Sequence, residues 1–465
     1  TGPAGSTSTL FGATSFQGLT CTNAGKWIRF PSAATNRVLG NLTLRGNAGT
    51  NLYLRSLDAS PWKLGVAGAA GQSLWYVDVQ DSDARPGAIV TAVSSVSNGV
   101  NQNWFFSVPG ETNIWTGGTN TLWSNGTNWS RGRMPSEADA VVIPAAMPNY
   151  PALDADRLLN RLTLEPGASL SLNGRSLEVA GQAAIGGSLV ATGTEAMVFR
   201  GDVDFTGASV VPAMSTLVLA GDATQTVNAA GQTFFNVLVA NASTTVTFSA
   251  GISAMEFRCE SAAGGIRVAF APGSTSTIRD FVLLGATGRL VALRSTAPGS
   301  PWNLNVTGYD YVRGTDVQDC NAGGGGTIQP IADTIDSGSN SNWNFGALWA
   351  VWRGTNSSSF HNATNWEPQA VPTAGSWVLV EVTNGLSITS SSSVKAIYIG
   401  GSQPTLLQAT APLTVGSNFV VRSNGVAWLS RPVTVSNHVL VLSGGLLTHA
   451  IAEGTTAAAS ATLSA

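Results

Sequence analysis

Residues 162–179 read LTLEPGASLSLNGRSLEV, and this stretch decides the fold. Three short runs of alternating apolar and polar residues are separated by Pro166-Gly167 and Asn173-Gly174. Alternation with a period of two is typical of half-buried β-strands, and these dipeptides mark turns. The pattern continues through residues 160–250, and no stretch of the chain keeps a capped 3.6-residue apolar period. The sequence therefore predicts an all-β protein of short strands.

Strands of about three to five residues cannot bury a face alone, which leaves two architectures. In a parallel β-helix each coil stacks on the previous coil, whereas in a string of β-sandwich domains separate sheets pair face to face. The close, regular turn spacing favours the β-helix. Such a solenoid, with roughly 20–25 residues per coil, would form a rod on the order of 100 Å long. The string of β-sandwiches stays the alternative.

An internal duplication, with a spacing of about 238 residues, links the two halves of the chain. The copies share motifs in the same order: Leu54-Arg55-Ser56 with Leu293-Arg294-Ser295, Ser60-Pro61-Trp62 with Ser300-Pro301-Trp302, Asp78-Val79-Gln80-Asp81 with Asp316-Val317-Gln318-Asp319, Asn103-Trp104 with Asn342-Trp343, and Asn128-Trp129 with Asn365-Trp366. Each unit has two parts. We expect β-helix coils in 1–109, a Trp-rich entry followed by coils in 110–238, and the same two parts of the second unit in 239–346 and 347–465.

Composition narrows the class of protein. Only 11% of the 465 residues are charged, the net charge is −3, and three residues are lysines. This low and slightly negative charge does not provide the basic surface that binding to nucleic acid requires. No apolar run approaches the roughly 20 residues that span a bilayer. Polarity comes instead from Ser, Thr, Asn and Gly, which favours an extracellular, cell-surface protein. Because the chain starts at Thr1, we expect a processed chain or a fragment of a longer array.

Three cysteines, Cys21, Cys259 and Cys320, leave at least one thiol unpaired within the chain. Cys259 and Cys320 form the least implausible bridge, but in the first unit the equivalent positions hold Cys21 and Ser82, which cannot pair. We therefore favour buried free thiols that act as small hydrophobic side chains.

Three stretches carry a family resemblance. Trp115, Asn128-Trp129, Gly132, Pro135, Asp139 and Val141-Val142-Ile143 resemble segments of bacterial autotransporter passengers and filamentous-haemagglutinin-like surface proteins. Residues 225–241 and 76–84 resemble the coils of large bacterial β-helix repeat proteins. The resemblance implies a right-handed parallel β-helix exported to the cell surface, and it carries over no catalytic site. Ser376 replaces Asp139 in the second unit, so Asp139 is not expected to perform essential chemistry.

One carboxylate cluster has the composition of a possible Ca²⁺ site, namely Asp78, Asp81 and Asp83. The competing interpretation places these residues at turns, where Asp accepts backbone N–H groups. In the second unit Asn321 replaces Asp83, which favours the turn interpretation. We therefore expect no catalytic residue, no bound cofactor and no established metal site.

Four tryptophans, Trp104, Trp129, Trp343 and Trp366, each follow an asparagine. If they were exposed in a row they would stack on sugar rings, since an indole face is flat and apolar. Large aromatic side chains are usually mostly buried, so we favour plugs of the coil interior or covers of a joint between the parts of each unit.

These observations favour a non-enzymatic structural repeat protein that forms an elongated rod or filament at a bacterial cell surface. Open solenoid ends would allow head-to-tail self-association. A carbohydrate-binding adhesin that recognises cell-surface glycans is the alternative. A β-helix polysaccharide lyase or hydrolase is third, because the duplication of the carboxylate cluster weighs against catalysis.

Overall fold

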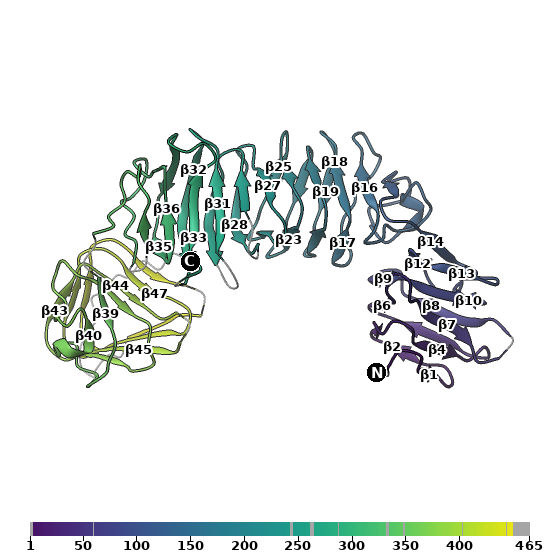
Figure 1. Cartoon of the computed structure of the whole chain (residues 1–465), viewed down its shortest axis with the longest axis horizontal. Helices are drawn as coiled ribbons and strands as arrows, with labels where there is room; N and C mark the ends of the chain where they lie inside the picture. The colour runs from purple at the N-terminus through teal and green to yellow at the C-terminus, as the bar shows by residue number, and fades with distance from the viewer. Residues whose placement is uncertain are drawn as a thin grey trace. The chain divides into compact units, whose positions relative to one another are not determined.

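The computed structural model describes residues 3–449 except 59, 242–244, 261–264, 287, 332–333, 347–348, 402 and 443. Within these residues the protein is nearly all β, and parallel coils stack into a β-solenoid of about 20 turns (Figure 1). The predicted solenoid fold is confirmed. The alternative of β-sandwich domains is wrong, because strands of successive coils pair in parallel instead of forming antiparallel sheets.

The strands form three solenoid segments, each with its own sheets. We call them the first segment (residues 7–107), the second segment (112–336) and the third segment (349–449). One compact unit contains the described residues up to 328 together with 335–342, and another contains the described residues of 329–334 and those from 343 onward.

The first segment has three parallel sheets, one on each side of its coils. Sheet 1a contains β1 (Thr7–Thr9), β4 (Trp27–Phe30), β7 (Leu52–Ser56), β10 (Val77–Gln80) and β13 (Val96–Asn98). Sheet 1b contains β2 (Ser15–Phe16), β5 (Thr35–Val38), β8 (Trp62–Val66) and β11 (Ser82–Asp83). Sheet 1c contains β3 (Leu19–Cys21), β6 (Leu42–Arg45), β9 (Gln72–Trp75), β12 (Val90–Val93) and β14 (Trp104–Ser107).

The second segment is built on two long sheets and one short sheet. Sheet 2a contains β15 (Thr112–Ile114), β16 (Ala140–Ile143), β18 (Arg161–Leu164), β21 (Ala183–Ile185), β24 (Val203–Asp204), β27 (Gln225–Asn228), β29 (Thr245–Phe248), β31 (Ile266–Phe270), β33 (Val291–Ser295), β36 (Thr315–Val317) and β38 (Ile335–Asp336). Sheet 2b contains β17 (Arg157–Leu159), β20 (Leu177–Val179), β23 (Ala196–Phe199), β26 (Thr216–Leu219), β28 (Thr233–Val239), β30 (Ser253–Glu260), β32 (Thr275–Leu284), β34 (Trp302–Val306) and β37 (Cys320–Asn321), with β35 (Asp310–Arg313) also paired to β32. Sheet 2c contains β19 (Ser169–Ser171), β22 (Ser188–Val190) and β25 (Ser209–Val211).

The third segment repeats the three-sided arrangement. Sheet 3a contains β40 (Trp366–Glu367), β39 (Trp349–Trp352), β41 (Trp377–Val380), β44 (Ala396–Ile399), β47 (Phe419–Val421) and β50 (Val439–Val441). Sheet 3b contains β42 (Leu386–Ile388), β45 (Thr405–Ala409), β48 (Gly425–Leu429) and β51 (Leu446–His449). Sheet 3c contains β43 (Ser392–Val394), β46 (Leu413–Val415) and β49 (Val433–Val435). Two 3₁₀ turns, η1 (Gly126–Asn128) and η2 (Ala363–Asn365), lie in the first coil of the second and third segments, after β15 and β39.

A strict coil length orders the middle of the second segment. The inward-facing partners along sheet 2b are Leu159, Val179, Phe199, Leu219, Val239 and Cys259, so each of these coils takes 20 residues. Each of these side chains is almost completely buried, whereas the residues that alternate with them within each strand face outward. Alternation along each strand therefore builds one continuous apolar column. The unit boundary expected at 238/239 falls within β28, whose sheet continues on both sides.

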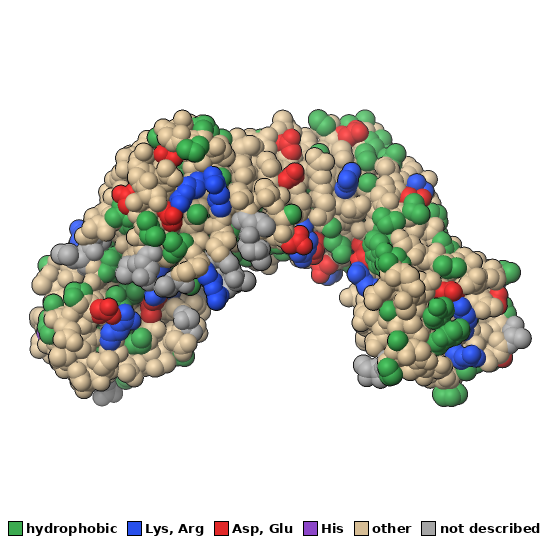
Figure 2. Space-filling model, in the orientation of Figure 1, with side chains coloured by type: hydrophobic (Ala, Val, Ile, Leu, Met, Phe, Trp, Pro, Cys, Tyr) green, Lys and Arg blue, Asp and Glu red, His purple; other side chains and the backbone are tan. Residues whose placement is uncertain are grey.

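Aromatic stacking inside the coils recurs in both copies. Phe30 and Trp62 stack with ring centroids 4.0 Å apart and planes at 10°, and Phe270 and Trp302 stack at 4.0 Å and 15°. The duplicated Ser-Pro-Trp motif thus supplies an interior side chain in each copy. On the face drawn in Figure 2, charged side chains lie scattered between polar and backbone atoms, as expected from the low charge of the sequence.

Candidate functional site

The Asn-Trp pairs at 128–129 and 365–366 organise the first coil of the second and third segments. Trp129 is 3% exposed and Trp366 is 1% exposed, and their indole nitrogens donate to the carbonyls of Trp123 and Phe360 at 2.8 and 2.7 Å. Asn128 Oδ1 accepts the N–H groups of two successive loop residues. Asn365 does the same. The structure therefore places both tryptophans in the interior, where their faces cannot stack on a sugar.

The other two Asn-Trp pairs, 103–104 and 342–343, lie at the ends of the first and second segments. Asn103 has a left-handed φ of 60°, and its side-chain amide donates to two carbonyls of the preceding coil. Asn342, with φ of 62°, repeats this arrangement. Trp104 is half-buried against Trp62 and Phe106. Trp343 is also half-buried and stacks on Phe345 at 5.7 Å. The four tryptophans therefore do not form an exposed row.

The structure does not bring Asp78, Asp81 and Asp83 together. Asp78 lies in sheet 1a, Asp83 lies in sheet 1b, and the corner between the two sheets separates them. Asp81 occupies the corner with φ of 52°, where its carboxylate accepts the N–H of a residue in the next coil at 3.0 Å. Asp83 binds Arg85, whose hydrogen bond lowers the pKa of Asp83. Among the described residues, no three His, Cys, Asp or Glu side chains gather as a metal site requires.

Asp78 instead belongs to a clamp between coils that recurs in the second copy. Arg55 Nη2 lies 2.9 Å from Asp78 Oδ1, and Arg55 Nη1 donates to the Asp78 carbonyl at 2.6 Å. Arg294 and Asp316 make the same two contacts, with the carbonyl bond again at 2.6 Å. A polar pair kept in both copies with the same geometry is typical of a structural role.

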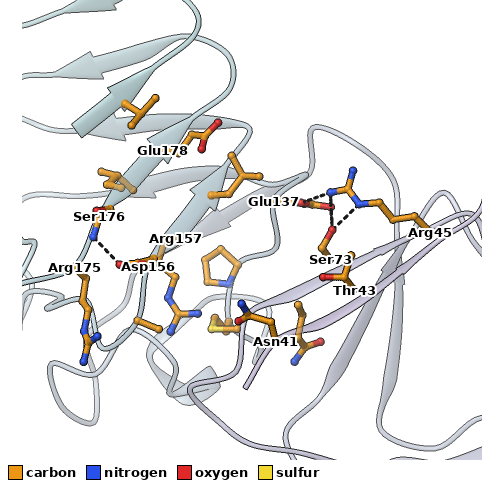
Figure 3. A pocket seen from close by; sticks show the side chains of 18 of the residues that line it. Asn41, Thr43, Arg45, Ser73, Glu137, Asp156, Arg157, Arg175, Ser176 and Glu178 are labelled. Atoms are coloured by element: carbon orange, nitrogen blue, oxygen red, sulfur yellow. Dashed lines mark hydrogen bonds and ion pairs between the residues drawn. The ribbon is translucent and has the colours of Figure 1, made fainter. Parts of the chain in front are cut away.

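A polar cleft lies between the first and second segments, which belong to the same compact unit (Figure 3). This cleft has a volume of about 750 Å³. One wall is the outer face of sheet 1c, where Thr43 and Ser73 are neighbours in register. The other wall is the outer face of sheet 2b, where Leu158, Glu178 and Val198 are in register. The cleft is therefore formed by two sheet surfaces, one rich in hydroxyl groups and one with aliphatic side chains.

Glu137 closes one end of the cleft and joins its two walls. Arg45 Nη2 donates to both carboxylate oxygens of Glu137, at 2.9 and 2.8 Å, and Ser73 Oγ donates to Oε1 at 2.9 Å. The indole N–H of Trp75 also donates to Oε1. Burial raises the pKa of Glu137, and the hydrogen bonds and the Arg45 charge only partly oppose it. Three residues of the first segment thus hold one carboxylate supplied by the second.

A second contact between these segments lies beside Glu137. The Arg133 side chain is almost fully buried, and its guanidinium lies 4.2 Å from the ring centroid of Phe105 in β14. Asp139, also fully buried, accepts from Arg133 Nη1 at 2.5 Å and Nη2 at 2.9 Å, and from the Ser136 N–H at 2.6 Å. Asp139 is therefore a structural counter-ion for a buried cation.

The opposite end of the cleft carries further charged groups. Burial lowers the pKa of Arg157, although the Asp154 carboxylate that it binds acts in the opposite direction. Arg157 Nε is buried without a hydrogen-bond partner. Asp156 Oδ1 accepts the Ser176 N–H at 2.8 Å, and Glu178 pairs with Arg200. Figure 3 shows the guanidinium groups of Arg157, in β17, and of Arg175, in the turn before β20, extending the same way.

The cleft residues were not singled out by the sequence. Arg45 and Glu137 are 92 residues apart, so no local pattern predicts their contact. The duplication does hold a signal for this contact. Leu284 aligns with Arg45 and Ala374 aligns with Glu137, so the second copy lacks both members of the pair, as expected for residues that interact. The positions aligned with Arg133 and Asp139 are Ala370 and Ser376, which is again a loss of both partners.

No disulfide bond joins Cys21, Cys259 and Cys320, and Cys259 and Cys320 are buried. Burial raises the pKa of Cys259 to about 12, which keeps the thiol protonated. No helix among the described residues is both long and apolar enough to cross a membrane.

Comparisons with known proteins assign no family to this chain. No protein-family description matches it, and no curated protein or solved structure is significantly similar.

Proposed function

We propose that this chain is part of an extracellular structural repeat protein that forms a rod or filament at a bacterial cell surface. The observation that carries the proposal is what the two copies share. The stacked Phe-Trp pair, the Arg-Asp clamp and the Asn-Trp pairs at 128–129 and 365–366 recur with the same contacts. The charged residues of the cleft do not recur. Repetition thus preserves the scaffold and not a reaction site.

The buried interior supports a structural role. Each coil is held by backbone pairing to the coils on either side and by the apolar column inside. In such a solenoid, stability is a sum of coil and neighbour terms, so added repeats lengthen the protein without a new core design. Exposed charge is sparse, so repulsion between neighbouring molecules is low.

The aromatic residues at the ends of the segments indicate how the rod would be extended. Within the chain, tryptophan-containing turns begin the second and third stacks, and Trp104 with Phe106 packs on the last coils of the first. Extension by covalent tandem repetition is therefore the first form of the proposal, and head-to-tail contact between separate chains is the second.

Two measurements test the proposal. Antibodies against this chain should label intact cells of the source bacterium, and external protease should remove the label without lysis. Labelling only after lysis would contradict surface exposure. Sedimentation and negative-stain microscopy over a concentration series then separate the two forms: particles that stay monomeric at the highest concentration exclude head-to-tail assembly.

A screen on uronate polymers, with and without Ca²⁺, tests the lyase alternative. We expect no turnover. Turnover that is lost in Asp156→Asn or Glu178→Gln, with folding retained, would replace the structural proposal by an enzymatic one.

A further inference from the structure

We propose that the cleft between the first and second segments binds an uncharged saccharide that contacts both segments. This inference goes beyond the structural role and does not depend on it. A volume of about 750 Å³ lies within the range of small-ligand sites, and two sheets of the rigid scaffold form the walls.

The charge around the cleft indicates an uncharged ligand. Three arginines line it, Arg45, Arg157 and Arg175, and three carboxylates balance them, Glu137, Asp156 and Glu178. Most of these groups are already paired: Arg45 with Glu137, Arg157 with Asp154, and Glu178 with Arg200. Neither an anion nor a cation would find a net opposite charge.

Four groups in the cleft keep free hydrogen-bonding capacity. The side chains of Asn41, Thr43 and Arg175 have no hydrogen-bond partner among the described residues, and Asp156 uses only one carboxylate oxygen. Together they offer an amide, a hydroxyl, a guanidinium fork and a carboxylate oxygen. Planar groups with adjacent donors or acceptors suit the neighbouring hydroxyls of a sugar.

The two walls match the two kinds of surface on a saccharide. Thr43 presents a free hydroxyl group on sheet 1c beside Ser73, whose own hydroxyl is held by Glu137 and Arg45, and Leu158 and Val198 present aliphatic groups on sheet 2b. A sugar ring has hydroxyls at its edge and C–H groups on its faces, so one ring can satisfy both walls. A peptide fits less well, because strands inside a solenoid are paired on both sides and leave no free edge for an added strand.

A glycan array on the purified chain, followed by titration calorimetry on each hit, tests this proposal. We expect a neutral oligosaccharide to bind with little salt dependence, because no ion pair forms on binding. Arg175→Ala and Asn41→Ala should each weaken binding at least tenfold. Both positions are exposed, so the fold should remain intact. Arg267→Ala removes an exposed arginine on sheet 2a of the same unit and should leave affinity unchanged.

Hydrogen exchange with saturating ligand gives an independent readout. Protection should increase both in β6 of the first segment and in β20 of the second. No neutral hit on the array, binding of acidic glycans or peptides alone, or affinity unaffected by Arg175→Ala and Asn41→Ala would each overturn the proposal. Protection confined to one segment would overturn the bridging geometry. None of these outcomes bears on surface location, so the two proposals fail separately.

Discussion

Replacing Asp139 by serine, the residue at the aligned position of the second copy, should destabilise the start of the second segment strongly. The change leaves the Arg133 guanidinium buried, with side-chain exposure of 1%, and removes its two short hydrogen bonds. Glu111 Oε2 lies 3.6 Å from Arg133 Nη2, so the Glu111 carboxylate neutralises the buried Arg133 charge only in part. Breaking a buried ion pair from one side costs about 3–5 kcal/mol.

The matched control is the double variant Arg133→Ala with Asp139→Ser, which copies the second repeat at both positions. Because no buried charge is left unpaired, the double variant should be more stable than the single variant despite carrying one more substitution. We expect a coupling free energy of about 2 kcal/mol or more between the two positions, within the range measured for neighbouring residues. Part of the gain is offset by the lost Arg133 contact with Phe105.

Hydrogen exchange is the appropriate assay, because coils of a solenoid open locally and a single unfolding free energy does not describe the chain. In the single variant, opening of β15 and β16 should increase about 100- to 4,000-fold, since each 1.4 kcal/mol is tenfold. The coils of the third segment provide an internal reference. If the double variant were as unstable as Asp139→Ser, or if the single variant changed exchange less than threefold, the buried pair would not be the stabilising element.

Three further outcomes are expected. Burial acts to raise the pKa of Glu195, but hydrogen bonds from Thr192 and Gly174 outweigh it and lower the pKa to about 2. The stabilisation by Glu195 is therefore complete above about pH 4.5 and is lost as the pH falls toward 2. Exchange at Thr192 should follow that pH dependence, and Glu195→Gln should abolish it. Trp129→Ala should cost about 3–5 kcal/mol of local stability by exchange, and an unchanged first coil would refute its role as an interior plug. The buried Cys259 should resist alkylation in the native protein, as followed by mass spectrometry, and labelling at the rate of the unfolded chain would contradict its burial.

The sequence alone predicted the scaffold because the signals for coils are local. Alternation along Leu162–Leu164 and Leu177–Val179 placed leucines inward, and the turn pairs between them limited strand length. The duplication located the interior tryptophans, although it did not separate interior Trp129 from half-buried Trp104. Asp78, Asp81 and Asp83 had the composition of a Ca²⁺ site because they are close in sequence. The sequence does not show that the chain turns a corner between sheets 1a and 1b at this point, which separates the three carboxylates.

The cleft was decided by tertiary structure. Arg45, Ser73 and Glu137 meet only because two stacks of coils adjoin, and side chains 92 residues apart leave no periodic trace in the sequence. The same holds for Arg133 above Phe105. Local patterning therefore determined which side chains fill the coils, because each coil buries its own alternate residues. Which outward-facing side chains share a surface depended on how the coils stack and where one stack ends.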